Sequence, residues 1–179
     1  LNTVLDVRRL EVGRMELDLV PISIADLLEH ALEPMKALIQ HNKQILRRWI
    51  GENLPVVAGD PRLLQRVVEN FLGNAIKFAS LEGELEVGAY YNADTGCVRV
   101  WVGDNGPGVP EVLRERIFEK YSQAPGEERR GTGLGLAFCN LVIAAHNGRI
   151  GMDDRPGEGS IFWFDLPAQA KDEETPHAK

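Results

Sequence analysis

The spacing of apolar side chains predicts a series of helices. From residue 1 to Gly13, apolar residues recur with a helical period, which predicts the end of a longer helix. Ser23 is a typical N-cap, with Asp26 three residues later, and it predicts a helix to about Gln40. The segment after Asp60-Pro61 is apolar around much of its surface, so we expect a deeply buried helix there. Two further helices are predicted at 110–118 and 134–146.

Runs of alternating and β-branched residues predict strands between these helices. Residues 84–91 and 98–102 flank a turn and predict a β-hairpin. Residues 149–152 and 160–166 predict a second hairpin, and further strands are expected at 15–20 and 45–50. This mixture predicts an α/β fold, a two-layer sandwich in which a mixed β-sheet is covered on one face by α-helices.

Composition narrows the class of protein. The 179 residues, 44% of them hydrophobic, are enough for one domain, and a net charge of −7 argues against a nucleic-acid partner. No apolar run approaches the roughly 18 residues that span a bilayer and no signal peptide begins the chain, so a cytoplasmic location is expected. Cys97 and Cys139 lie in apolar segments without metal-ligand spacing, which predicts free, buried thiols. Because the chain starts inside a helical pattern, we expect it to be a piece of a longer protein.

Two glycine-rich segments indicate a nucleotide pocket. One reads V-G-D-N-G-P-G-V over 102–109, and the other reads R-G-T-G-L-G-L-A over 130–137 and opens a predicted helix. Glycine lets backbone N–H groups approach phosphate, and a helix N-terminus adds a partial positive charge. The second segment is not a Walker loop, a Rossmann fingerprint or a protein-kinase glycine loop. A flexible linker is disfavoured, because Leu134 and Leu136 have the character of pocket lining and helix start.

Polar residues on two predicted elements are candidates for binding. Asn70, Asn74 and Lys77 share one face of the helix after Asp60. Amide oxygens ligate Mg²⁺ and an ammonium group meets phosphate, but the same spacing also describes the solvated side of an amphipathic helix. Asp104 ends an apolar strand, where a buried carboxylate needs donors such as the adenine amine. Its D-N-G context is equally typical of an Asx turn.

Taken in order, these motifs resemble the ATP-binding catalytic domain of two-component sensor histidine kinases, within the wider gyrase, Hsp90, histidine kinase and MutL (Bergerat-type) ATPase fold. The resemblance covers about residues 20 to 167. It is carried by Gln65–Phe78 (asparagine box), Asp104–Gly108 (first glycine box), Ile117–Tyr121 (phenylalanine box), Gly131–Leu136 (second glycine box) and Gly157–Ser160 (closing strand pair).

The resemblance implies roles for individual residues. Asn70 and Asn74 would hold Mg²⁺ and the phosphates, Lys77 would neutralise phosphate charge, and Asp104 would accept the adenine amine beside Ser160. The segment from Glu119 to Arg130 would be the ATP lid, in which Arg129 and Arg130 either reach phosphate or only solubilise the lid. The remaining ATP-binding residues implied by the resemblance are Gly106, Gly108, Tyr121, Arg130, Gly131, Thr132, Gly133, Leu134, Gly135 and Leu136.

The family transfers the γ-phosphoryl group of ATP to a histidine on a helical dimerisation domain. None of His30, His41, His146 and His177 has the sequence context of that acceptor, so the acceptor is expected upstream of this chain. His30 and His41 are interpreted as exposed helix residues and His146 as a helix C-cap. The expected domains are 1–17, the C-terminal end of the dimerisation and phosphoacceptor helix, 18–167, the ATP-binding catalytic domain, and 168–179, a charged disordered tail.

The implied partners are the phosphoacceptor domain and a response regulator, with a monomeric fragment and a homodimeric parent. A second hypothesis is a degenerate module that binds ATP and a protein partner without phosphorylating a histidine.

Overall fold

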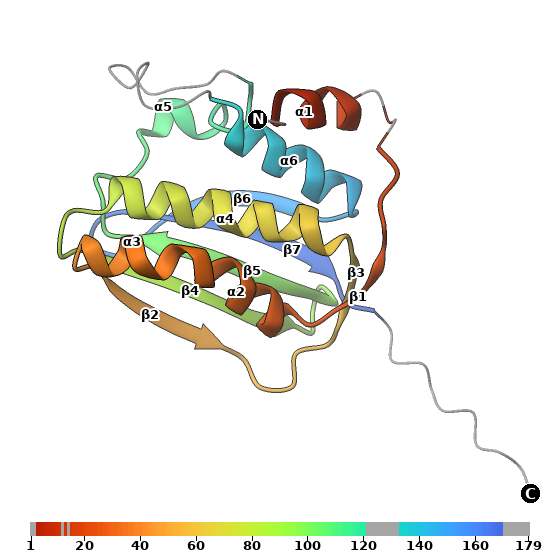
Figure 1. Cartoon of the computed structure of the whole chain (residues 1–179), viewed down its shortest axis with the longest axis horizontal. Helices are drawn as coiled ribbons and strands as arrows, with labels where there is room; N and C mark the ends of the chain where they lie inside the picture. The colour runs from red at the N-terminus through yellow and green to blue at the C-terminus, as the bar shows by residue number, and fades with distance from the viewer. Residues whose placement is uncertain (1–2, 12, 14, 121–132, 170–179) are drawn as a thin grey trace, which may run out of the picture.

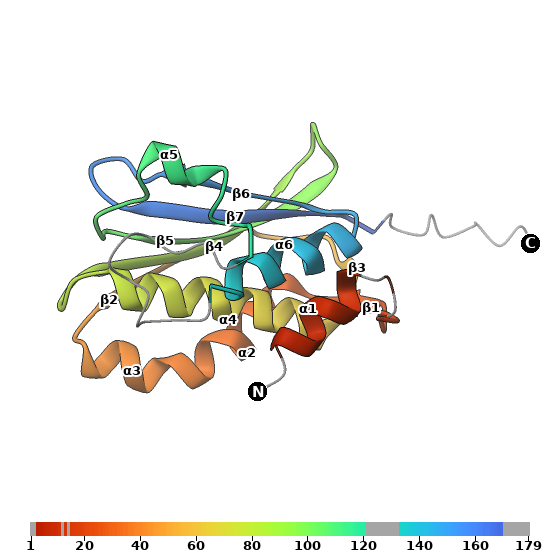
Figure 2. The same cartoon turned by 90° about the horizontal axis from the view of Figure 1, so that it is seen from above.

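The computed structural model describes residues 3–11, 13, 15–120 and 133–169 of the chain. One layer is a five-stranded mixed β-sheet, and α2, α3, α4 and α6 lie on one side of it (Figures 1 and 2). The helices of the described segments are α1 (Thr3–Glu11), α2 (Ile24–Leu32), α3 (Lys36–His41), α4 (Pro61–Phe78), α5 (Glu111–Arg114) and α6 (Gly135–Ala145), with a 3-10 turn η1 (Glu33–Met35). The predicted two-layer α/β sandwich is therefore confirmed.

The sheet has the strand order β2-β4-β5-β7-β6. Only β2 and β4 run parallel, and every other neighbouring pair is antiparallel, so both predicted hairpins are confirmed. A short antiparallel pair, β1 with β3, lies apart from this sheet. The strands are β1 (Val20–Ile22), β2 (Ile45–Ile50), β3 (Val57–Gly59), β4 (Glu84–Asn92), β5 (Cys97–Asp104), β6 (Arg149–Asp154) and β7 (Ser160–Pro167).

Three predicted elements need correction. The predicted strand at 15–20 is wrong, because residues 15–19 are irregular and the backbone N–H of Asp18 donates to the Asp60 side chain instead of a strand partner. The helix expected to run to Gln40 is interrupted by η1, where Pro34 has no N–H to donate. The helix predicted at 110–118 ends at Arg114, after which the chain continues in tight turns.

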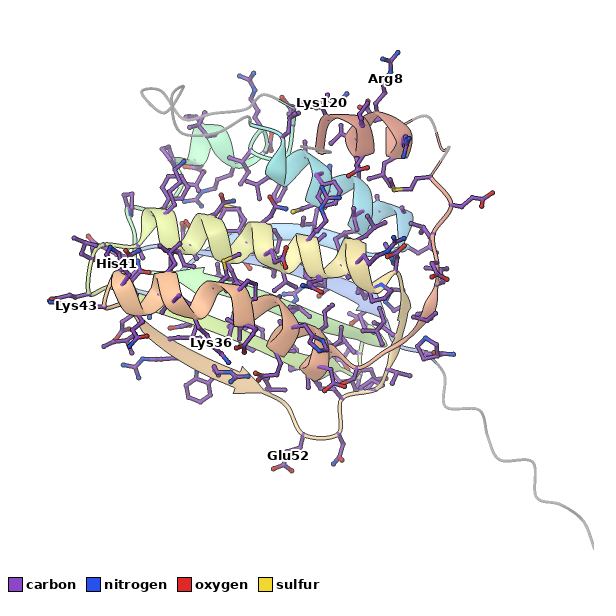
Figure 3. All side chains as sticks on the ribbon, in the orientation of Figure 1. Arg8, Lys36, His41, Lys43, Glu52 and Lys120 are labelled. Atoms are coloured by element: carbon purple, nitrogen blue, oxygen red, sulfur yellow. The ribbon has the colours of Figure 1, made fainter. Side chains whose placement is uncertain are left out.

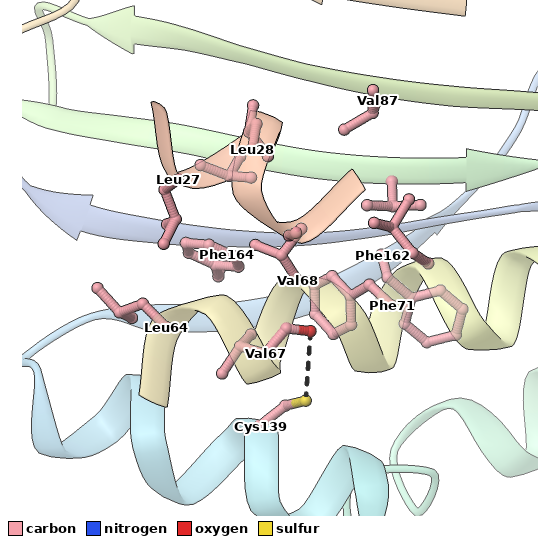
Figure 4. Packing of buried hydrophobic residues seen from close by; sticks show 14 of the residues in the cluster. Leu27, Leu28, Leu64, Val67, Val68, Phe71, Val87, Cys139, Phe162 and Phe164 are labelled. Carbon is pink, nitrogen blue, oxygen red and sulfur yellow. Dashed lines mark hydrogen bonds between the residues drawn. The ribbon is translucent and has the colours of Figure 1, made fainter. Parts of the chain in front are cut away.

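Helix α4 is the centre of the core. Phe71 is fully buried, and its ring centroid lies 5.7 Å from that of Phe162 and 6.1 Å from that of Phe164 on β7. On the other side of α4, the Cys139 thiol of α6 donates to the Val67 carbonyl oxygen (Figure 4). Both cysteines are free, as predicted, but only Cys139 is buried, and burial raises the pKa of its thiol so that it stays neutral.

The opposite face of the sheet is covered by its own aromatic side chains. The three tryptophans of the chain pair with two glycines in one row across the strands: Trp49, Gly88, Trp101, Trp163 and Gly151. A Cβ atom at Gly88 would lie 2.2 Å from the Trp101 ring, and one at Gly151 would lie 2.4 Å from the Trp163 ring. The indoles therefore occupy space that side chains at these glycines would need, and they shield this face without a second helical layer.

None of the helices in the described segments is long and apolar enough to cross a membrane.

His146 joins two helices at their ends. It is the C-cap of α6, as predicted, and it is buried. Its Nε2 accepts a hydrogen bond from the backbone N–H of Asp60 at 2.9 Å, and its Nδ1 lies 2.7 Å from the Val142 carbonyl oxygen. The proton therefore sits on Nδ1, which donates to Val142. His30 and His41 are exposed, as predicted, and Figure 3 shows His41 at the outer end of the helical layer.

His146→Ala should lower the free energy of unfolding by about 1–3 kcal/mol, because the buried N–H of Asp60 loses its acceptor. Denaturant unfolding followed by circular dichroism measures the change. The matched control is His41→Ala, which removes an exposed imidazole and should change stability by less than about 0.5 kcal/mol. Equal stabilities for the two variants would contradict this assignment.

Candidate functional site

Helix α4 carries the first group of predicted site residues. Its N-cap is Asp60, whose Oδ1 accepts from the backbone N–H groups of Arg62 and Leu63, and its apolar face packs on the sheet. The predicted polar face is present, with Asn70 and Asn74 half-buried and Lys77 exposed. The Lys77 ammonium lies 4.4 Å from the centroid of the Phe78 ring. The two asparagines are thus not on a fully solvated face of the helix.

The Asn70 amide is oriented by its own helix. Its Nδ2 donates to the carbonyl oxygen of Arg66 at 2.7 Å. A Cβ atom at Gly135 would lie 2.6 Å from the Asn70 Oδ1, so the amide oxygen points at the first residue of α6. Arg66 in turn lies over the Phe138 ring of α6, with its Cζ 4.2 Å from the ring centroid. These contacts bring the asparagine-bearing helix and the second glycine segment together.

The N-terminus of α6 is a candidate site for binding an anion. Among the described residues, no side chain caps this eleven-residue helix, whose N-cap residue is the buried Leu134. Uncapped N–H groups and the helix dipole favour a negatively charged ligand. Gly133 precedes Leu134 with a positive φ, and Leu136 packs against the core. Four of the predicted site residues lie outside the described residues: Tyr121, Arg130, Gly131 and Thr132. So does the expected lid from residue 121 to Arg130.

The second group of predicted residues lies where β5 ends. Asp104 is 3% exposed, and its Oδ1 accepts from the backbone N–H of Gly106 at 2.8 Å. The Asx turn weighed from the sequence is therefore present. Burial raises the pKa of the Asp104 carboxyl, and the Gly106 N–H, the Arg155 charge and the Ser160 backbone only partly oppose that rise. The carboxylate is thus a buried acceptor that a further donor would stabilise.

The turn that carries Asp104 docks on the C-terminal end of α4. A Cβ atom at Gly106 would lie 2.5 Å from the Phe78 carbonyl oxygen. Asn105 fixes the turn from the other side, because its Oδ1 accepts from the Glu84 N–H at 2.9 Å and its own N–H donates to the Glu84 carbonyl oxygen. Sequence reasoning gave Asn105 no role, although the D-N-G pattern contains two residues able to make side-chain bonds to the backbone.

The closing strand pair completes this end of the site. Ser160 is buried and pairs directly with Asp104 across β7 and β5. Gly159 lies against the same residue, because a Cβ atom there would lie 1.8 Å from the Asp104 carbonyl oxygen, and Gly108 lies beside the Gly159 carbonyl oxygen. Phe118 of the phenylalanine box packs edge-on against Phe162, with 6.4 Å between ring centroids. Gly159 was read only as part of the strand motif, and no sequence signal showed how close it lies to Asp104.

The two groups are separated along one rigid helix. Asn70 marks the contact with α6, and Phe78 marks the contact with the β5 turn. Eight residues of α-helix at 1.5 Å each separate them by roughly 12 Å. The described segments contain no group of three or more His, Cys, Asp and Glu side chains able to hold a metal ion. A cation between these groups would therefore need amide oxygens, or oxygens of a ligand, as its ligands.

Comparison with known proteins identifies this arrangement. The family model described as histidine kinase-, DNA gyrase B-, and HSP90-like ATPase matches residues 59–170. The chain is 40% identical over 148 residues to the adaptive-response sensory kinase SasA of Synechocystis sp., covering 82% of this chain and 38% of SasA. It is 37% identical over 173 residues to the sensor histidine kinase AruS of Pseudomonas aeruginosa, covering 93% of this chain and 17% of AruS. The chain thus spans less than half the length of these relatives.

Solved structures agree with the sequence relatives. Full-length ShkA, solved in complex with AMPPNP, superposes with a TM-score of 0.82 at 36% identity, covering 94% of this chain and 35% of that chain. The catalytic domain of the histidine kinase ThkA has a TM-score of 0.76 at 26% identity, covering 86% of this chain and 97% of that domain. With the two glycine segments and the asparagine helix in contact as described, the chain belongs to the histidine kinase-, DNA gyrase B-, and HSP90-like ATPase family, as a histidine kinase ATPase domain.

Proposed function

We propose that this chain binds Mg²⁺-ATP between α4, the β5 turn and the start of α6, and that it is the catalytic module of a sensor histidine kinase. The γ-phosphoryl group would pass to a histidine located upstream, outside this chain. The observation that carries the proposal is that one helix, α4, contacts the uncapped N-terminus of α6 near Asn70 and the turn of the buried Asp104 at Phe78.

In this proposal the adenine lies at the β5 end of the site. The Asp104 carboxylate accepts a hydrogen bond from the exocyclic amine, beside Ser160, and Gly106 and Gly108 keep the turn free of side chains beneath the base. The buried carboxylate gains a donor that its own turn does not supply. The complex of ShkA with the ATP analogue AMPPNP, at 36% identity, supports ATP as the nucleotide.

The triphosphate lies at the α6 end. Asn70 and Asn74 would supply amide oxygens to Mg²⁺, and Lys77 would face the phosphates. The N–H groups of Gly133, Leu134, Gly135 and Leu136 would donate to the phosphates. When bound, Mg²⁺ neutralises phosphate charge during phosphoryl transfer. The chain contributes mainly by positioning the nucleotide. Tyr121, Arg130, Gly131 and Thr132 complete the proposed site on the resemblance alone.

The parent protein is proposed as a homodimer whose dimerisation domain carries the acceptor histidine. The phosphoryl group would then pass to a response regulator. We place both steps in the cytoplasm, where ATP is available. Residues 1–17 are proposed as the segment in which its second helix ends, with α1 stopping at Glu11. The catalytic domain at 18–167 and a tail at 168–179 follow, although Ala168 still pairs with Val57. Support comes from α1, which packs on α6 through the buried Val7 and leaves Val4 and Leu5 more than half exposed.

Asp104→Asn should weaken Mg²⁺-ATP binding about 10- to 150-fold, because it removes a hydrogen bond to a charged acceptor worth about 1.5–3 kcal/mol. Isothermal titration calorimetry with excess Mg²⁺ measures the dissociation constant. Asp94→Asn, on the exposed β4–β5 turn, is the control and should bind as the wild type does. No nucleotide binding by the wild-type chain at millimolar ATP would refute the proposal.

Asn74→Ala should weaken Mg²⁺-ATP binding about tenfold while leaving adenosine binding unchanged, because adenosine has no phosphates for Mg²⁺ to bridge. Asp104→Asn should weaken both ligands. Arg62→Ala, at the exposed start of α4, serves as the control. An equal loss of ATP and adenosine binding in Asn74→Ala would mean that Asn74 acts only through the structure of the site.

Gly159→Ala should destabilise the domain and weaken ATP binding, because its Cβ atom would overlap the Asp104 carbonyl oxygen. Gly157→Ala is a matched control in the same turn, since both glycines have a positive φ but nothing lies within 4 Å of a Cβ atom at Gly157. We expect Gly159→Ala to cost at least about 1–3 kcal/mol more in unfolding free energy than Gly157→Ala. Thermal unfolding and titration calorimetry compare them, and equal effects would contradict the close packing of this turn on Asp104.

A further inference from the structure

Arg155 connects two strands that are not neighbours. It follows β6 in the turn before β7, and its backbone N–H donates to the Gly159 carbonyl oxygen, which closes that turn. Its guanidinium reaches β4, where Nε lies 3.0 Å from the Glu86 Oε1 and a terminal nitrogen lies 2.9 Å from the Glu84 Oε2. Because β7 and β5 lie between β6 and β4, the side chain spans the ends of two strands.

This span crosses the end of β5 where Asp104 sits. Asp104 pairs with Leu85, between Glu84 and Glu86, on one side and with Ser160 on the other. Side chains alternate along a strand, so Glu84, Glu86 and Arg155 lie on the open face and Asp104 on the helix-covered face. The residue before Asp104 is Gly103, which carries no side chain onto the open face along this path.

The charge of Arg155 acts on Asp104 through this thin part of the sheet. Burial raises the pKa of Asp104, and the positive charge of Arg155 is among the influences that lower it. Charged groups near this end of the sheet include Glu84 and Glu86 of β4, Arg47 of β2, which pairs with Glu84, and Glu158 in the turn after β6. They also include Lys77 of α4, which lies over Phe78, and Asp153 and Asp154 of β6, the latter paired with Arg114. Within the described residues, Arg155 is the cation identified as acting on Asp104.

We propose that Arg155 is a positioning residue for adenine recognition, which holds the end of β5 from the open face and keeps Asp104 in the state that accepts the adenine amine. The proposal rests on the function proposed above. Arg155 does not touch the nucleotide in this arrangement. It acts by fixing the turn that packs Gly159 and Ser160 against Asp104 and by favouring the ionised carboxylate.

The pH dependence distinguishes this role from simple bracing of the fold. The amine needs the carboxylate form, so ATP affinity falls as the pH drops through the pKa of Asp104. Arg155 lowers that pKa, so its removal should raise the pKa and start the fall at a higher pH. A residue that only braces the fold would lower affinity by the same factor at every pH.

The test is Arg155→Gln, with the dissociation constant of Mg²⁺-ATP measured by titration calorimetry from neutral to mildly acidic pH. We expect binding about three- to tenfold weaker than wild type at mildly acidic pH, and a smaller loss, within about twofold, at neutral pH. The matched control is Arg47→Gln, which removes another arginine paired with Glu84, at 2.8 Å, without acting on Asp104. Its pH profile should follow that of the wild type, which also accounts for titration of ATP itself.

Two further variants sharpen the result. Arg155→Lys keeps the charge and should stay closer to the wild-type profile. In an Asp104→Asn background, Arg155→Gln should no longer shift the pH dependence, because the titrating carboxyl is gone. An Arg155→Gln profile parallel to that of the wild type, or the same shift in the Asp104→Asn background, would overturn the proposal.

A substitute variant and the wild-type measurement separate misfolding and loss of the proposed function from loss of the Arg155 role. Should Arg155→Gln fail to fold, Arg155→Met takes its place: it removes the same charge but keeps an unbranched apolar stem, so the acid loss of binding should again start at a higher pH, and an unchanged profile would overturn the proposal. Wild-type protein that binds no ATP would refute the proposed function. Wild-type protein that binds ATP, with no altered pH profile in Arg155→Gln, would refute only the role of Arg155.

Discussion

The site depends on the burial of one amphipathic helix. The apolar face of α4 packs on β5, and its Phe71 packs on Phe162 and Phe164 of β7, which fixes the height and rotation of the helix over the sheet. Because a helix is rigid, this contact also fixes the rest of α4, including Asn70, which meets α6, and the Phe78 carbonyl, which meets the Asp104 turn. His146 anchors the start of the same helix through Asp60. The proposed nucleotide site, which joins three elements distant in sequence, is thereby held by packing in the core beneath it.

Electrostatics at the β5 end follow from the same packing. Asp104 is buried because it is the last residue of a buried strand, and this burial raises the pKa of its carboxyl group. The structure offsets this cost only in part, through the Gly106 N–H, the Arg155 charge and the Ser160 backbone. An acceptor left incompletely satisfied in the free protein gains more from a ligand donor than a fully bonded one would. The Asx turn and adenine recognition, which are rival interpretations of D-N-G in the sequence, are therefore compatible, since the turn bond to Oδ1 also orients the carboxylate.

The sequence predicts local structure well where a single period or cap decides it. The N-caps Ser23 and Asp60, the two hairpins and helix α6 are all found, because each is set by residues close together in the chain. The weak alternation at 15–20 misled, because only Val20 of that segment pairs with another strand, and the Asp60 side chain accepts a hydrogen bond from the N–H of Asp18. Asn105 and Gly159 were missed for a related reason. Their roles arise from contacts with Glu84 and Asp104 across strands, and no local pattern encodes strand register.

The role proposed for Arg155 illustrates why a determinant of a site can leave no motif. It lies on the face of the sheet opposite the Asp104 side chain, in a turn that resembles any glycine-rich hairpin, and its partners lie about seventy residues away on β4. Alternation along a strand places neighbouring residues on opposite faces, so a cluster on the open face is separated from Asp104 only by the thickness of the sheet. The row of tryptophans covers the middle of that face, whereas Arg155, Glu84 and Glu86 lie at the end where β5 stops. In this proposal, the open face of the two-layer fold influences ligand chemistry on the helix-covered face, because the charge of Arg155 acts across a single strand without any contact to the ligand.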